Sequence, residues 1–171
     1  MKNATIKNLT AAGLCAAVGL ILPYFFHLFG AGPAFLPMHI PVLICGLLCG
    51  YRYGAICGLA VPILSSLLTG MPPLFPAAIA MMFELAAYGL VSGLLYKKYN
   101  VYISLIGAML SGRAVSGIAY AILLGFSGKP YGLPAFLTGA FATALPGIII
   151  QIVIVPVIII IMKKSGFINK M

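Results

Sequence analysis

The amino-acid sequence predicts an all-α integral membrane protein, a bundle of six transmembrane helices with both ends in the cytoplasm. Three observations support this class. The 171 residues are 63% hydrophobic and only 6% charged, whereas about a quarter of the residues in a soluble domain are charged. Apolar runs long enough to cross a bilayer recur along the chain. Finally, the basic residues lie in the short gaps between these runs.

Breaks in hydrophobicity divide a single transmembrane domain, residues 1–171, into six helices. The first begins with an apolar run after Lys2 and Lys7, a pattern that also occurs in signal peptides. Because the run leads directly into further spans, we interpret it as a retained membrane helix. Pro23 is expected to kink or end it. The second helix is short, and a tight turn at residues 51–53 precedes the third. The predicted helices span about residues 6–26, 38–50, 54–68, 77–96, 101–124 and 135–162.

The distribution of Lys and Arg sets the orientation, because cytoplasmic loops are enriched in basic residues. With the N-terminus inside, only Lys129 lies outside and Arg113 lies within a span. The remaining basic residues are all cytoplasmic: Lys2, Lys7, Arg52, Lys97, Lys98, Lys163, Lys164 and Lys170. The sequence therefore predicts an N-in, C-in protein. A net charge of +9 in this pattern does not indicate a nucleic-acid partner, which would require basic residues clustered on a solvated face.

The outer connections differ from the cytoplasmic ones. Cytoplasmic turns are short and basic, whereas residues 30–37, 69–76 and 125–134 are rich in Gly, Pro and aromatic residues. Such segments cost less entropy to order than flexible ones, and non-helical backbone is tolerated at membrane depth where it lines a cavity. We therefore expect function at the outer face.

Two ionisable residues lie in the middle of predicted spans. Glu84, the only acidic residue of the chain, lies in the fourth helix, and Arg113 lies at similar depth in the fifth. An isolated charge there costs at least ~2.5–3.5 kcal/mol, so the two are expected to pair or to contact a ligand. A buried bridge that only fixes helix packing stays open as the alternative. In the functional interpretation Arg113 binds a carboxylate or phosphate through its planar fork.

Further polar residues complete the candidate binding site. His39, at the outer start of the second helix, is either an interfacial residue or a ligand contact. Gln151, deep in the sixth helix, must find a partner on another helix or at a cavity floor. Tyr88 and Tyr120 offer hydroxyls to a ligand. The four cysteines lie in apolar stretches and are interpreted as small packing residues.

Small residues recur at four-residue spacing, which lets helix backbones approach closely. Most instances, such as Gly54 with Gly58 and Gly89 with Gly93, are expected to pack within the bundle. The stripe of the first helix, Ala12-x-x-x-Ala16 with Gly13-x-x-x-Ala17 beside it, is the best candidate for a surface that docks a partner, and Ala12 and Ala16 are the predicted docking residues.

No motif indicates an enzyme. The sequence contains no GxxxxGK[ST] for ATP hydrolysis, no His/Asp/Glu cluster for a catalytic metal and no GxSxG nucleophile elbow. With Glu84 as the single carboxylate, a carboxylate dyad is excluded. We predict no catalytic residue, no metal and no cofactor.

Several of these features occur together in one family. The segments Leu36-Pro-Met-His-Ile-Pro-Val-Leu-Ile-Cys-Gly46 and Leu64-Ser-Ser-Leu-Leu-Thr-Gly-Met-Pro-Pro-Leu-Phe-Pro76, the Glu84 helix, the early alanine stripe and the six-helix topology resemble substrate-binding S components of energy-coupling factor (ECF) vitamin transporters. The resemblance covers essentially the full chain. It implies a multi-pass protein of the bacterial cytoplasmic membrane that binds a small vitamin or precursor from outside.

The resemblance also implies partners. The alanine stripe would dock on a membrane coupling subunit, which two ATPase subunits drive, so that ATP is hydrolysed by the partners and the S component topples to release its ligand inside. An arginine-led site favours an acidic ligand, pantothenate, over thiamine precursors and pyridoxine. The rival hypotheses are a proton-coupled secondary carrier or small channel that uses Glu84, and a membrane scaffold that transports nothing.

Overall fold

The computed structural model describes residues 2–28, 35–126, 128 and 132–165, and in these ranges every regular element is a helix. Five stretches are long and apolar enough to cross a membrane, and the 11-residue α3 is shorter. The elements are α1 (Lys2–Leu28), α3 (His39–Cys49), α4 (Tyr51–Thr69), η1 (Leu74–Ala78), α5 (Ile79–Leu95), α6 (Val101–Phe126), α7 (Leu133–Leu137), η2 (Thr138–Thr143) and α8 (Leu145–Lys164).

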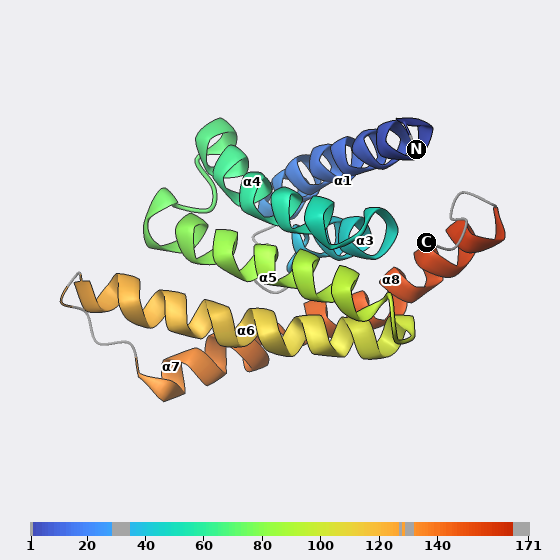
Figure 1. Ribbon diagram of the computed structural model, residues 1–171. Helices are drawn as coiled ribbons and strands as arrows, with labels where there is room; N and C mark the ends of the chain where they lie inside the picture. The colour runs from blue at the N-terminus through green and yellow to red at the C-terminus, as the bar shows by residue number, and fades with distance from the viewer. Residues whose placement is uncertain (1, 29–34, 127, 129–131, 166–171) are drawn as a thin grey trace.

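The short helix α3 lies at the centre of the bundle. Nine of its eleven residues are buried, because α1, α4, α5 and α8 all pack against it. Figure 1 shows α4, α5 and α6 side by side, with α1 beyond α4 and α8 crossing the far side. The core joins Leu43 and Leu47 of α3 to Leu85 of α5 and Leu105 of α6. A helix this apolar is stable at 11 residues because its neighbours bury it on nearly all sides.

Close backbone contact joins α4 to α5. A Cβ added at Gly54 would overlap backbone atoms of Gly46 and Gly89, and one added at Gly58 would overlap the backbone of Leu85. Only glycine fits at such distances, as in other small-residue membrane contacts. The predicted role of these glycines in internal packing is confirmed. The cysteines are free, and three of the four are buried.

The turn predicted at residues 51–53 is wrong. Tyr51, Arg52 and Tyr53 form the first turn of α4, and the chain reverses at Gly50 alone, whose φ of 91° is open to glycine at little cost. The third helix therefore begins at Tyr51 rather than at residue 54. The polar Arg52 suggested a loop, but the first residues of a helix need no internal hydrogen-bond acceptor for their N–H groups.

The predicted sixth helix, 135–162, is not continuous. It divides into α7, η2 and α8, with Ala144 between the last two. Pro146, in the first turn of α8, has no N–H to donate and its ring would crowd the carbonyl of Ala142, so a regular α-helix cannot pass through this point. In contrast, Pro23 lies inside α1 and does not end it. Most of the predicted outer loop 30–37 lies outside the described residues.

Candidate functional site

Helices α3, α5 and α6 bring three of the predicted polar residues together in the interior: His39, Glu84 and Arg113. The Glu84 carboxylate on α5 accepts a hydrogen bond at Oε1 from Arg113 Nη1 of α6, at 2.9 Å, and lies 3.3 Å from His39 Nε2 of α3. The three side chains are at most 9% exposed. The expected Glu84–Arg113 pair is thus present, and His39 belongs to the same cluster. Because unpaired charge is costly in a membrane interior, each ion compensates the other.

The local sequence explains how these side chains meet. His39 is the first residue of α3, and its backbone N–H donates to Leu36 O, at 3.1 Å, so the helix start is fixed. Tyr88, one turn after Glu84 on α5, meets the His39 ring edge-to-face at 5.0 Å between centroids and 83°. Gly112, directly before Arg113, has no side chain to collide with the Tyr88 ring. This glycine lets α6 approach closely enough for Arg113 to reach Glu84.

The cluster leaves hydrogen-bonding capacity unused. Among the described residues, these buried atoms of the cluster have no hydrogen-bond partner: His39 Nδ1, Tyr88 Oη, and Arg113 Nε and Nη2. The buried amide of Gln151 on α8 is unpaired as well. In native proteins nearly all buried polar atoms are paired, and a group of exceptions calls for an explanation such as a bound molecule. Arg113 uses one donor on Glu84 and keeps the Nε/Nη2 side of its guanidinium free. That side presents two parallel donors, which suit a planar carboxylate or a phosphate.

A narrow groove of about 190 Å³ runs between α6 and α8 beside Arg113. Its walls are otherwise apolar: Ile106, Met109, Leu110, Phe141, Ile148 and Ile152. Typical ligand pockets have volumes of about 300–1,000 Å³. This groove would therefore hold part of a small ligand rather than all of it.

The other predicted ligand contacts are placed as follows. Gln151 of α8 is fully buried, and its two amide atoms find no partner among the described residues. Tyr120 is half-buried on α6, seven residues after Arg113 and therefore about 10 Å further along the same side of the helix. The sequence did not single out Ser116, whose side chain interacts with the Glu84 carboxylate. Its position three residues after Arg113 on one helix face was the available signal.

The predicted docking stripe is only partly accessible. Ala12 and Ala16 are half-buried and pack against the core, whereas Gly13 and Ala17, on the adjacent side of α1, are exposed. A Cβ at Gly13 would meet no atom within 4 Å. Of the five long apolar helices α1 is the least buried, with 11% of its apolar window inside the molecule against 22–39% for the others. The exposed small residues are therefore Gly13 and Ala17 rather than the two predicted alanines.

A helical bundle with long apolar spans is typical of an integral membrane protein, and its buried cluster of polar side chains is the candidate binding site. Comparison with known families specifies the class: residues 7–159 match the family "ECF transporter, substrate-specific component", and the chain belongs to this family. The separate comparisons with curated proteins and with solved structures gave no match.

Family membership confirms several predictions. The chain is a multi-pass integral membrane protein and a transporter subunit, not an enzyme. As a substrate-specific component, it binds a small-molecule substrate and works together with an ECF module.

Proposed function

We propose that this chain binds a small water-soluble vitamin or vitamin precursor from the outside and delivers it by ATP-driven uptake. The unpaired buried atoms around the Glu84–Arg113 pair carry the proposal. An apolar bundle gains nothing from leaving such atoms unpaired, so a polar ligand that pairs with them accounts for their presence.

The free side of Arg113 favours a ligand with a carboxylate, which keeps pantothenate ahead of thiamine precursors and pyridoxine. Arg113 would then lie between two carboxylates, that of Glu84 and that of the ligand. The apolar groove along α6 and α8 would hold the uncharged part of the ligand.

We further propose that six helices, α3 among them, form the transmembrane bundle with both chain ends in the cytoplasm. The N-terminus, the α5–α6 turn and the end of α8 lie at one end of the molecule (Figure 1). Those three places hold most of the basic residues, so the positive-inside tendency puts that end in the cytoplasm. The α4–η1 and α6–α7 connections then face outward.

The ligand is tested by a thermal-shift screen of the purified chain against water-soluble vitamins, followed by calorimetric titration of each hit. We expect one acidic compound to bind, and Arg113→Gln to weaken it at least tenfold, because two charge-assisted hydrogen bonds are lost. Arg52→Gln, the same substitution on an exposed residue, is the control and should bind as the unmodified chain does. Equal affinity in Arg113→Gln would reduce Arg113 to a packing role.

Energy is proposed to come from partner subunits, a membrane coupling subunit and two ATPases, with no cofactor on this chain. We propose that the coupling subunit docks on α1, over Ala12 and Ala16 and the exposed Gly13 and Ala17. Ala17→Leu should leave the unfolding temperature of the isolated chain unchanged but prevent its co-purification with the module. Ala114→Leu, on the exposed side of α6, should change neither the unfolding temperature nor the co-purification. Uptake that persists without the ATPases would contradict the whole assignment and favour a proton-coupled carrier.

A further inference from the structure

Two cations from separate segments share one tyrosine ring at the basic end of the molecule. Lys97 Nζ, from the α5–α6 turn, lies 4.5 Å from the centroid of the Tyr51 ring, and Arg52 Cζ lies 5.6 Å from it. Arg52 Nε also donates a hydrogen bond to the Tyr51 hydroxyl, at 3.1 Å. Arg52 and Lys97 are exposed. The ring thus holds two like charges near each other at the surface.

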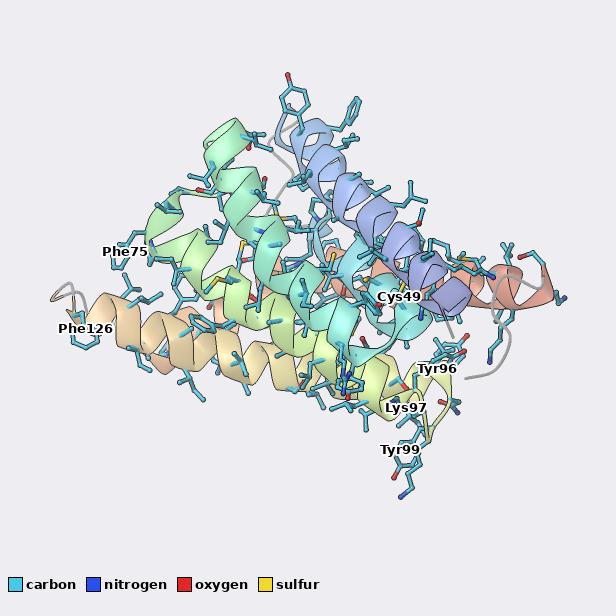
Figure 2. The ribbon with its side chains drawn as sticks, turned by 45° about the horizontal axis from the view of Figure 1, so that its top comes forward. Cys49, Phe75, Tyr96, Lys97, Tyr99 and Phe126 are labelled. Carbon is cyan, nitrogen blue, oxygen red and sulfur yellow. The ribbon has the colours of Figure 1, made fainter. Side chains whose placement is uncertain are left out.

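The same end carries two further pairs of this kind. Lys163 Nζ, in the last turn of α8, lies 5.1 Å from the centroid of the Tyr96 ring, and Lys98 Nζ lies 5.9 Å from that of Tyr99. Figure 2 shows Tyr96, Lys97 and Tyr99 together at this end, opposite Phe75 and Phe126. We call this group the cationic patch: Arg52, Lys97, Lys98 and Lys163.

The chain has no acidic side chain to neutralise the patch. It contains ten Lys and Arg residues and a single Asp or Glu. That residue, Glu84, is buried against Arg113 and His39. Cation–π contacts at exposed sites are weak and do not cancel charge, and Arg52 and Lys97 repel each other across one ring. The counter-charge of the patch must therefore come from another molecule.

We propose that the cationic patch binds the phosphate groups of anionic phospholipids. The patch lies where the apolar helices end: Lys97 follows α5 by two residues, and Lys163 is the penultimate residue of α8. Tyrosine rings and basic side chains at that level are typical of the headgroup region. From the same end, exposed Leu90 and Leu94 run along α5 and exposed Ile103 lies on α6, so acyl chains have an apolar surface beside the phosphate site. An acidic protein surface would not need this apolar face.

The test titrates phosphatidylglycerol or phosphatidylcholine into detergent micelles of the full chain and follows the unfolding temperature. We expect phosphatidylglycerol alone to raise it in a saturable manner. Each neutralised lysine near the surface should raise the half-saturating concentration roughly fivefold, so Lys97→Gln/Lys163→Gln should raise it roughly 25-fold. Lys97→Arg/Lys163→Arg keeps both charges and should behave as the unmodified chain. Lys129→Gln, a lysine between α6 and α7, is the control for a lost charge elsewhere.

Three results would overturn the proposal. The first is an equal response to both lipids, and the second is an unchanged half-saturating concentration in the double Gln variant. The third is an unaltered lipid response together with loss of binding to the ECF module in that variant, which would assign the patch to an acidic partner surface instead. Free glycerol phosphate, added at the same concentrations, should have no effect, because it lacks the acyl chains that α5 and α6 would contact. None of these outcomes depends on whether a vitamin binds at the Glu84–Arg113 cluster.

Discussion

The two halves of α5 meet their neighbours in different ways. In the second half, Gly89 lies against the backbone of Gly54, and a Cβ at either position would overlap the backbone of the other helix. In the first half, Gly58 of α4 still lies against the backbone of Leu85, but long polar side chains are added: Glu84 reaches Arg113 on α6 and His39 on α3. The second half joins helices by the absence of side chains, and the first half adds charged ones.

The two halves of α5 therefore have different roles: the glycine contacts fix the fold, and the polar side chains form the candidate site. The glycine half is filled, so any added atom must displace backbone. The polar half leaves buried donors and acceptors unpaired. A rigid half that fixes α5 against α3 and α4 allows the other half to hold a preorganised but incomplete set of hydrogen-bonding groups, as ligand sites require. Substitutions in the glycine half should therefore affect stability alone, whereas those in the polar half should affect stability and ligand binding.

The largest effect is expected from Glu84→Gln. This substitution leaves the Arg113 guanidinium buried with no counter-charge, and breaking one partner of a buried pair costs about 3–5 kcal/mol. The free energy of unfolding in mild detergent, obtained from denaturant titration, measures the loss.

Replacing both partners is the control for that experiment. Glu84→Leu/Arg113→Met removes both charges, keeps similar volumes and should recover most of the lost stability, because no ion is left uncompensated. The same double variant should bind no vitamin. If the single variant is as stable as the double one, Glu84 and Arg113 do not depend on each other.

A smaller loss, about 1–3 kcal/mol, is expected from Gly89→Ala in the glycine half. The added methyl group would force α4 and α5 apart, and overpacking of a close contact costs about 1–3 kcal/mol. Gly13→Ala on the exposed side of α1 is the matched control. Its Cβ meets no atom, and alanine is the better helix former by about 1 kcal/mol. Equal stability of the two variants would mean that α4 and α5 do not touch at Gly54.

The sequence was sufficient to predict features that follow from hydrophobicity and charge. It predicted the all-helical membrane class and the shortness of α3 from apolar length. From the cost of isolated charge it also gave a Glu84–Arg113 pair as one of two expectations, the other being ligand contact. It failed where a single residue decided the backbone. Gly50 alone makes the turn that was assigned to residues 51–53, and Pro146 divides a hydrophobic run that shows no break in composition.

For the site, the sequence predicted which residue types matter but not how they are combined. His39 is 45 residues from Glu84 in the chain, so its place in the cluster depends on the packing of α3 inside the bundle. The half-buried state of Ala12 and Ala16 likewise depends on the rotation of α1 about its axis. A spacing of four residues defines one side of a helix, but it does not show whether that side faces the core or the lipid.

The smallest effect on stability, with a separate loss of binding, is expected from Gln151→Leu. The fully buried amide has no partner among the described residues, so an apolar side chain of similar size should leave the free energy of unfolding unchanged or slightly higher. If the amide hydrogen-bonds the ligand, affinity should fall about tenfold, as measured by calorimetry with the vitamin identified by screening. Ile158→Leu on the same helix should change neither quantity. Lower stability with unchanged affinity would instead mean that Gln151 pairs with another helix, and the binding site would then be limited to α3, α5 and α6.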